Sequence, residues 1–395
     1  MPKPEFGFGR SGRASGGDIF TRMKDGFILH PNARMFQAGH LVAGFGPLAV
    51  AFAAMPFRIG GQGGVQAGHG QFETLTSGSS GVPRRVIRGV ATWAASFALN
   101  AEMFGIGPGV RVAVLGGLEQ SLAVYGAIEA LSLGADLHLL AAMRPDRQRR
   151  VLAAQAVDVV YATPAQLRLM VECGGDMLRV RVIVVGGAKL DARLRLDLAA
   201  LAPCAMVREF YGAAETSFIT ITGPDTPPDS VGRAYPGVQI DLRGEGKIGQ
   251  IWVKSPYLFD GYAGNDQGGA VWDQGWLSVG EMGWLTDGYL YLAGRAGRMV
   301  TVADTNVFPE AIEAFLLAQP GVDRAAVLPR ADPLRGVVMV AVLQGDALRE
   351  QAILAAARTQ FGALAAPRSV IWLEDWPMLA SGKADYRQLA GLVGG

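Results

Sequence analysis

Hydroxyl side chains and glycines crowd one short stretch, TSGSSG at residues 76–81, and Arg84 and Arg85 follow it. Glycine lets the backbone reach positive φ and lets a ligand approach the main chain. Successive N–H groups in such a loop form a concave site for an anion. The hydroxyls and Arg84 add hydrogen-bond donors and positive charge. The stretch is typical of a phosphate-binding loop, but also of a flexible surface loop, and these residues alone leave both open.

Two familiar loops are excluded here. The stretch lacks the Gly-x4-Gly-Lys-Ser/Thr spacing of a Walker A loop. It also lacks the Gly-x-Ser-x-Gly spacing of a nucleophile elbow. The rest of the chain must therefore decide what the loop binds.

Two further stretches follow apolar runs that read as strands. VVGGAKL (184–190) places Gly186, Gly187 and Ala188 after one strand, and EFYGAAETS (209–217) offers Tyr211, a glycine and Glu215 after the next. Ligands of open parallel sheets bind beyond the carboxyl ends of strands. The first stretch is equally compatible with an ordinary strand-to-helix turn. The second suits a nucleotide or metal site, although a Tyr-Gly turn is common.

The last third of the chain adds three charged candidates. GWLSVGEMGWLTDGYLYLAGR (275–295) contains Glu281, ends at Arg295 and includes Asp287-Gly288, a strong hairpin signal. WPMLASGKADYRQL (376–389) places Lys383 directly after a glycine. Lysines are mostly exposed, so Lys383 taken singly favours a surface position over a catalytic one.

An alternation of strands and helices must position these residues. Strands are predicted at 111–117, 135–140, 157–163 and 180–187, and helices at 121–134, 145–156 and 164–174. This rhythm favours an α/β fold whose parallel sheet is covered on both faces. From about residue 231 short strands and turns predict a β-rich subdomain. After Arg295 a smaller α/β pattern returns, with strands at 325–328, 337–343 and 369–373.

Composition bounds the class of protein. The chain has 395 residues, of which 50% are hydrophobic and 18% charged, so it is long and apolar enough to bury a large core. Its 36 Lys and Arg nearly cancel its 35 Asp and Glu, which gives no case for a nucleic-acid partner or an anionic membrane. Cys173 and Cys204 form no metal spacing. The N-terminal residues lack a signal-peptide core, so a cytoplasmic location is expected.

Residues 41–57, LVAGFGPLAVAFAAMPF, carry no charge. The stretch is short for a membrane span, and glycines and prolines interrupt it. It is predicted to be a buried core segment, so no membrane span is expected. The four histidines, at 30, 40, 69 and 138, are scattered and are interpreted as structural or surface residues.

Taken in order, these stretches resemble the adenylate-forming enzymes, the superfamily of acyl-CoA synthetases, peptide-synthetase adenylation domains and firefly-type luciferases. TSGSSGVPRRV resembles the family's phosphate loop, GGAKL its adenine-side loop and YGAAE its Tyr-Gly-x-Thr-Glu motif. VGRAYPGV (231–238), the stretch at 275–295 and SGKADYR (381–387) resemble later motifs. The resemblance covers residues 72–395. It implies an adenylation core over 1–296, with the β-rich subdomain at about 231–296, and a mobile C-terminal lid over 297–395.

The resemblance also implies a reaction and roles. Such an enzyme joins a carboxylic acid to the α-phosphate of ATP, with Mg²⁺, and passes the acyl group to a thiol of coenzyme A or of a carrier-protein pantetheine. Glu215 would bind Mg²⁺ and Lys383 would contact the α-phosphate and the carboxylate. Gly297 falls at the hinge of the lid. The positions implied for ATP are Thr76, Ser77, Gly78, Ser79, Ser80, Gly81, Arg84, Gly186, Gly187, Ala188, Tyr211, Gly212, Glu281 and Arg295.

The acyl pocket is less readable. The resemblance places Gln120, Thr163, Lys189 and Ala214 around it. Lys189 could pair with a second acidic group on the substrate or point to solvent. The sequence leaves the acid, the oligomeric state and the choice between coenzyme A and an acyl carrier protein open.

Several positions depart from the family's pattern. Arg84 stands where lysine is usual, Ala214 where threonine is usual, and Glu281 where aspartate is usual. Residues 303–305, Ala-Asp-Thr, replace Gly-Gly-Glu in the loop that lines the pantetheine channel, which puts thioester formation in doubt. The N-terminal region reads as shortened. An acyl- or aryl-CoA ligase is therefore expected. The alternatives are an enzyme that loads a carrier protein and a catalytically weakened nucleotide-binding relative.

Overall fold

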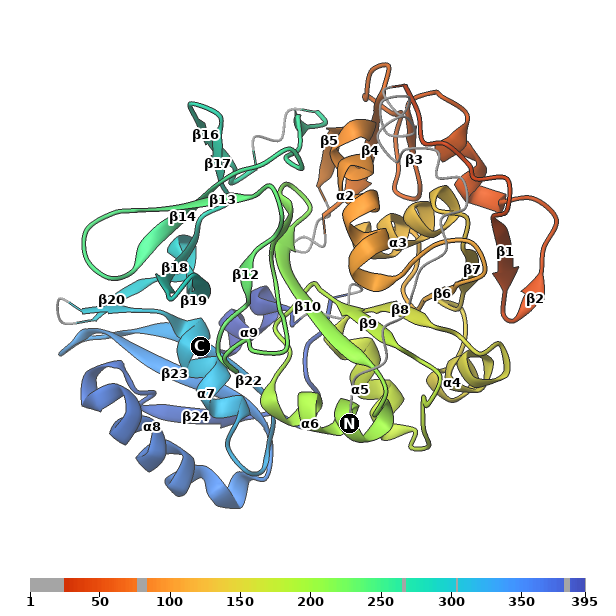
Figure 1. The fold of residues 1–395 in the computed structure, drawn as a ribbon. Helices are drawn as coiled ribbons and strands as arrows, with labels where there is room; N and C mark the ends of the chain where they lie inside the picture. Colours follow the sequence, from red (N-terminus) through yellow and green to blue (C-terminus); the bar gives the residue numbers. More distant parts are fainter. Residues whose placement is uncertain (1–24, 77–83, 265–267, 303–304, 380–383, 395) are drawn as a thin grey trace, which may run out of the picture.

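The computed structural model describes residues 25–76, 84–264, 268–302, 305–379 and 384–394. Its central sheet contains a parallel run of six strands in the order β10-β9-β8-β6-β7-β1, shown in Figure 1. The strands are β1 (Arg34–Gln37), β6 (Arg111–Val114), β7 (Asp136–Leu139), β8 (Val159–Ala162), β9 (Val182–Val185) and β10 (Met206–Ala213). The α/β expectation is confirmed.

Helices cover both faces of this run. Helices α2 (Val90–Phe104) and α3 (Ser121–Ser132) pack with one set of strand residues, which includes Val112 and Val114. Helices α4 (Pro145–Ala154), α5 (Pro164–Glu172) and α6 (Ala192–Leu201) pack with the alternate set, which includes Ala113 and Leu115. Successive side chains of a strand point to opposite faces. Strands that must be apolar on both faces therefore read as unbroken apolar runs.

The sheet continues into an antiparallel part, drawn in green and teal at the left of Figure 1. Its strands are β11 (Ser217–Ile221), β12 (Arg233–Ala234), β13 (Gln239–Arg243), β14 (Gly249–Lys254), β16 (Val271–Asp273), β17 (Trp276–Ser278), β18 (Glu281–Thr286) and β19 (Tyr289–Arg295). Asp287 and Gly288 join β18 to β19 with φ of 52° and 76°. Two positive φ values in a two-residue loop suit the twist of a hairpin, so the predicted turn is confirmed.

A smaller sheet carries the two ends of residues 76–84, which we call the hydroxyl-rich loop. Its order is β15-β5-β4-β3. The strands are β3 (Phe57–Arg58), β4 (Gln71–Leu75), β5 (Arg85–Gly89) and β15 (Gly261–Tyr262). Strand β15 pairs antiparallel with β5, so a segment that lies between β14 and β16 of the large sheet in sequence completes the small one.

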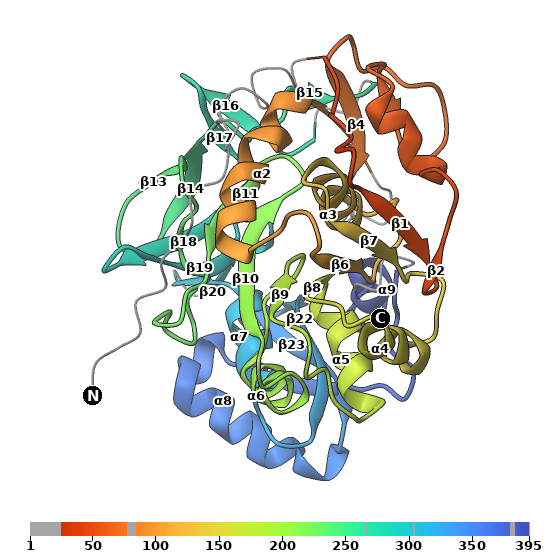
Figure 2. The same cartoon turned by 45° about the vertical axis from the view of Figure 1, so that its right-hand side comes forward.

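The C-terminal part forms its own three-stranded sheet, β22-β23-β24. Its elements are η2 (Ala296–Arg298), β20 (Val300–Val302), β21 (Thr305–Val307), α7 (Pro309–Leu317), β22 (Val322–Asp332), β23 (Gly336–Gly345), η3 (Ala347–Arg349), α8 (Glu350–Ala365), β24 (Ser369–Trp372) and α9 (Tyr386–Val393). Helices α7 and α8 cover one face and α9 the other. This sheet and α8 lie at the end opposite β4 and α2 in both views (Figure 2).

The prediction that residues 41–57 form a buried core segment is wrong. They contain the end of β2 (His40–Leu41) and η1 (Gly46–Phe52). Leu48, Ala51 and Phe57 are buried, whereas Leu41 and Met55 are 62% and 69% exposed. The glycines and prolines that interrupt the stretch leave only a short 3-10 helix, and few of its side chains reach the core. In the part of the chain that the structure describes, no helix is long and apolar enough to cross a membrane.

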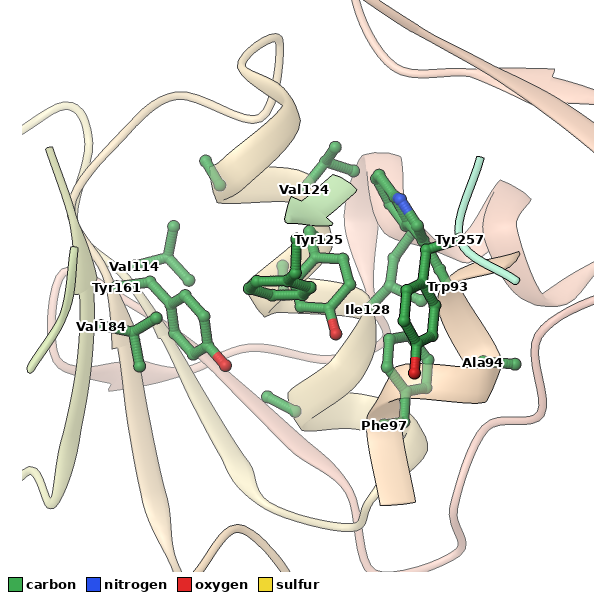
Figure 3. Packing of buried hydrophobic residues seen from close by; sticks show 14 of the residues in the cluster. Trp93, Ala94, Phe97, Val114, Val124, Tyr125, Ile128, Tyr161, Val184 and Tyr257 are labelled. Atoms are coloured by element: carbon green, nitrogen blue, oxygen red, sulfur yellow. The ribbon is translucent and has the colours of Figure 1, made fainter. Parts of the chain in front are cut away.

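A polar network lies inside the core between α2, α3 and β8. Glu129, which is fully buried, accepts hydrogen bonds from Asn100 (2.8 Å) and Tyr125 (3.0 Å) and from the hydroxyl of Tyr161. The rings of Tyr125 and Tyr161 lie in the cluster of Figure 3. Burial raises the pKa of Glu129 from 4.5 to about 7, against the opposing effect of these hydrogen bonds.

This shift predicts a pH dependence of stability. Because the pKa of Glu129 is higher in the folded chain, the folded state binds more protons between about pH 4.5 and pH 7. The free energy of unfolding therefore falls as pH rises through that window. We expect Glu129→Gln to lose this part of the pH dependence, measured by urea unfolding at pH 5, 6, 7 and 8. If the free energy of unfolding changes with pH equally in both proteins, Glu129 is not the group whose pKa is raised.

Candidate active site

The ends of the hydroxyl-rich loop are joined directly. The N–H of Thr76 donates to the carbonyl of Arg84 at 2.8 Å, and the N–H of Arg84 donates to Oγ1 of Thr76 at 3.0 Å. Both residues flank strands β4 and β5, which pair antiparallel. The predicted positions Ser77, Gly78, Ser79, Ser80 and Gly81 lie outside the described residues.

A buried carboxylate supports the base of this loop. The side chain of Glu73, on β4, is fully buried and lies 2.5 Å from Nη1 of Arg58 and 3.7 Å from Nη1 of Arg85. It also accepts hydrogen bonds from the backbone N–H groups of Gln66 and Ala67. Buried charges need such partners. The ion pairs and hydrogen bonds hold the glycine-rich segment 58–71 against the strands that carry the loop.

Glu215 lies in the turn between β10 and β11. Its Oε1 accepts a hydrogen bond of 2.7 Å from the hydroxyl of Tyr262, and its backbone carbonyl accepts one of 2.8 Å from the N–H of Phe259. Tyr262 belongs to β15 and pairs with Val86 of β5. Glu215 is thereby connected to the strand that leaves the hydroxyl-rich loop, two residues after Arg84.

The turn has little room for side chains at Gly212. A Cβ at this position would lie 1.7 Å from the carbonyl oxygen of Ser217. The register of β10 and β11 shifts between Tyr211 and Gly212, as it does at a β-bulge. Glycine is therefore required by the close approach of the two strands, which turns Glu215 toward β15.

The surroundings of Glu215 fit a Mg²⁺ ion held mainly by its nucleotide. Among the described residues, no group of three or more His, Cys, Asp or Glu side chains could hold a metal. The hydrogen bond from Tyr262 engages Oε1 of the carboxylate, and a metal ion could be bound through Oε2. Mg²⁺ is commonly bound through one or two carboxylates, water and substrate phosphates. A single carboxylate, such as that of Glu215, is compatible with that arrangement.

Tyr211, Glu281 and Arg295 lie on the three strands β10, β18 and β19. Nε of Arg295 donates to Oε1 of Glu281 at 2.9 Å, and the two residues are opposite each other in the β18–β19 pair. The hydroxyl of Tyr211 is buried and has no hydrogen-bond partner among the described residues. Burial raises the pKa of Tyr211, and Glu281 adds to this effect while Arg295 opposes it. Glu281 and Arg295 therefore lie near enough to influence the Tyr211 hydroxyl by their charges.

Gly186, Gly187 and Ala188 follow β9 directly. A Cβ on Gly186 would lie 2.2 Å from the ring of Phe210, so the aromatic ring packs on the glycine backbone. Gly187 has φ of 91°, and a Cβ there would lie 3.7 Å from the methyl group of Thr163. This turn and the start of α5 are neighbours.

The implied acyl-pocket residues divide into two groups. Gln120 precedes α3 without a side-chain capping bond, whereas the Thr163 side chain caps α5. The side chains of Gln120 and Gln166 both lie close to Gly116. Ser121, next to Gln120, donates to the carbonyl of Leu75 at 2.8 Å, which ties α3 to the base of the hydroxyl-rich loop.

Lys189 and Ala214 are placed differently. Nζ of Lys189 donates to the backbone carbonyl of Asp229 at 2.7 Å, and burial lowers the pKa of this lysine. The structure thus gives Lys189 a protein partner. Ala214 contributes its carbonyl as a hydrogen-bond acceptor for Arg88.

The predicted hinge residue lies in η2, between two arginines with different partners. Gly297 is exposed and has no heavy atom within 4 Å of an ideal Cβ. Arg295 is bound to Glu281 of β18, whereas Arg298 contacts Glu313 of α7 at 2.7 Å. Lys383 and residues 303–304 lie outside the described residues. The flanks of the lysine are described, and Met378 pairs with Ala384 in a β-bridge.

Sequence reasoning missed three residues of this region. Tyr262 donates to Glu215, Arg298 contacts Glu313 on the C-terminal side of Gly297, and Arg88 binds the turn that contains Glu215. The only sequence signal for Arg88 is a charged residue inside the apolar strand pattern RVIRGV (85–90). Nothing local in the sequence distinguishes the other two from surface residues.

Comparisons with known proteins identify the family and the fold of the chain. A family model described as AMP-binding enzyme matches residues 72–263, and the AMP-binding enzyme C-terminal domain matches residues 311–383. The chain is 32% identical over 326 residues to the uncharacterized acyl–CoA ligase YhfT of Bacillus subtilis, covering 80% of this chain and 67% of YhfT. It is 28% identical over 259 residues to the putative long chain fatty acid–CoA ligase VraA of Staphylococcus epidermidis, covering 64% of this chain and 56% of VraA.

A solved structure shares the fold. The amide bond synthetase McbA from Marinactinospora thermotolerans superposes with a TM-score of 0.74 at 25% identity, over 82% of this chain and 69% of that protein. The two family models match in order along this chain, the AMP-binding enzyme first and its C-terminal domain second. The chain belongs to the AMP-binding enzymes, the adenylate-forming superfamily.

Proposed function

We propose that the chain activates a carboxylic acid with ATP and Mg²⁺ and transfers the acyl group to the thiol of coenzyme A. One observation carries the proposal: the residues implied for ATP and the acid follow the carboxyl ends of neighbouring parallel strands. Gln120 follows β6, Thr163 follows β8, Gly186 follows β9 and Glu215 follows β10. Ligands bind at this edge in open α/β sheets. The names of the ligase relatives support the same reaction.

The first half-reaction needs positive charge and directed donors. A carboxylate oxygen of the acid attacks the α-phosphorus of ATP, the bond to the β-phosphate oxygen breaks, and pyrophosphate leaves. The loop from Thr76 to Arg84 would bind the departing phosphates, and Lys383 would stabilise charge at the α-phosphate. Donors fixed in place where charge develops supply much of such catalysis. Mg²⁺ at Glu215 would neutralise phosphate charge.

The nucleoside would lie beside β10. The ring of Tyr211 would pack on adenine, with Gly186, Gly187 and Ala188 on its other side. Glu281 and Arg295 would bind the ribose hydroxyls. Glu281 is one methylene longer than the aspartate usual in the family, and its ion pair with Arg295 supports a fixed position for the carboxylate.

The second half-reaction breaks the acyl–phosphate bond. The thiol sulfur attacks the acyl carbonyl, AMP leaves, and the thiol proton passes to solvent. Coenzyme A is the proposed acceptor because the relatives above are named CoA ligases. McbA is named an amide bond synthetase, so an amine is a further acceptor to assay. A cytoplasmic location is part of the proposal, since the thiols of Cys173 and Cys204 are exposed and unpaired.

Glu215→Gln should raise the Mg²⁺ concentration needed for half-maximal ATP–pyrophosphate exchange by about 10- to 100-fold, because an amide lacks the charge that a hard cation needs. Tyr262→Phe is the matched control, since it removes the hydrogen bond to Glu215 but keeps the carboxylate, and it should shift the requirement less. Exchange is measured with a panel of carboxylic acids across a Mg²⁺ titration. An unchanged requirement in Glu215→Gln would remove Glu215 from the metal site.

Lys383→Ala should lower pyrophosphate exchange by about 100- to 1,000-fold while the melting temperature stays unchanged, because one preorganised cation at the α-phosphate is lost. Lys254→Ala, which changes an exposed lysine at the end of β14, serves as control and should exchange normally. Near-normal exchange by Lys383→Ala would show that another residue stabilises the α-phosphate.

Gly297→Pro should leave pyrophosphate exchange largely intact and suppress acyl transfer to coenzyme A. Proline fixes φ near −65° and so restricts the swing that a hinge between Arg295 and Arg298 must absorb. Gly297→Ala is the control, because a Cβ meets no atom within 4 Å there. Exchange and thioester formation are assayed separately. Equal losses in both half-reactions would place the hinge elsewhere.

A further inference from the structure

An arginine is fully buried four residues after Arg84. Arg88 lies on β5 and is 0% exposed. Burial lowers its pKa to about 10, and the charges of Glu215 and Asp260 oppose that effect. Its hydrogen bonds in the described residues go to hydroxyl and carbonyl oxygens, with no carboxylate among them. A buried charge without a paired carboxylate is costly.

The two arms of the guanidinium bind the two sides of one turn. Nη2 donates to the carbonyl of Ala214 at 2.6 Å, and Nη1 donates to Oγ of Ser217 at 2.5 Å. Nη1 also lies 3.4 Å from the carbonyl of Tyr257. Ala214 and Ser217 stand on either side of Glu215 in sequence. The planar fork of arginine suits such two-point binding, which lysine cannot reproduce.

One residue of the turn that Arg88 contacts has an unfavourable backbone conformation. Ser217 has φ of 54°, a region that few residues other than glycine adopt. The N–H of Ala213 donates to Oγ1 of Thr216 at 2.9 Å, which tightens the turn from within. Backbone in sparsely populated regions persists when the surrounding structure fixes it. Arg88 supplies that constraint from a different sheet.

We propose that Arg88 is a positioning residue that holds the Glu215 turn against strand β5, which follows the phosphate loop in sequence. Strand β5 begins at Arg85, directly after that loop, so a bond from Arg88 to the turn connects the two binding elements. Tyr262 makes the second connection from the neighbouring strand β15. The inference rests on the proposed role of Glu215 with Mg²⁺-ATP.

A purely structural role for Arg88 predicts a different result. An apolar side chain of similar volume often replaces a buried charge with little loss of stability. Arg88→Met would then leave the Mg²⁺ requirement unchanged. If Arg88 positions the turn, the same variant loses metal affinity although Glu215 itself is intact.

The first measurement needs no activity. Hydrogen–deuterium exchange of the nucleotide-free protein should show faster exchange in the peptide 211–219 of Arg88→Met than in wild type. The second is the Mg²⁺ titration of pyrophosphate exchange, in which Arg88→Met should raise the half-saturating Mg²⁺ concentration by about 10-fold, the range seen when groups that orient metal ligands are removed.

Three variants make the result decisive. Arg88→Lys should fail to restore the wild-type Mg²⁺ requirement, because one ammonium cannot bind both sides of the turn. Ser217→Ala keeps the buried cation and should shift the requirement in the same direction by less, which also covers the case that Arg88→Met does not fold. Asp136→Asn removes the charge of the buried Asp136, which pairs with Arg34 on β1. This variant should lower the melting temperature but leave the Mg²⁺ requirement unchanged.

Two outcomes separate the inference from the function on which it rests. If wild type catalyses Mg²⁺-dependent exchange and Arg88→Met and Ser217→Ala keep its Mg²⁺ requirement, the positioning role is overturned. A wild-type Mg²⁺ requirement in Arg88→Lys would overturn the role of the two guanidinium nitrogens in binding both sides of the turn. If wild type exchanges pyrophosphate with none of the acids, the proposed function fails first, and faster deuterium exchange at 211–219 still reports whether Arg88 fixes the turn.

Discussion

The parallel strands of the central sheet are covered on both faces, and this constraint sets where chemistry can occur. Helices α2 and α3 occupy one face and α4, α5 and α6 the other, so the strand surfaces are closed to ligands. Only the loops beyond the strand ends remain accessible. The candidate residues after β6, β8, β9 and β10 all follow carboxyl ends, where parallel strands place them along one edge.

The site also needs a second sheet that is remote in sequence. Strands β4 and β5 flank the phosphate loop, and β15, which lies between β14 and β16 in sequence, pairs with β5. Arg88 and Tyr262 then bind the turn that contains Glu215. Buried polar contacts of this kind are costly when incomplete. These contacts join the turn that contains Glu215 to strands β5 and β15 of the smaller sheet.

Much of the fold could be predicted from local pattern. Apolar runs located β6 to β9, and turn residues located the β18–β19 hairpin, because backbone preferences act over a few residues. The failure at residues 41–57 has the opposite origin. An uncharged stretch is buried only if other elements cover it, and there only Leu48, Ala51 and Phe57 are buried. Coverage is decided by elements that are distant in sequence.

The sequence by itself determined the order of the motifs, the family resemblance and the types of the residues that would bind ATP. Only the tertiary structure decided which of them meet: Glu281 with Arg295, and Glu215 with Tyr262. In the folded chain, Nζ of Lys189 also donates to the carbonyl of Asp229, and the buried Arg88 donates to the Glu215 turn. Residue type is a local property, whereas burial and hydrogen-bond partners depend on how strands far apart in sequence pair and pack.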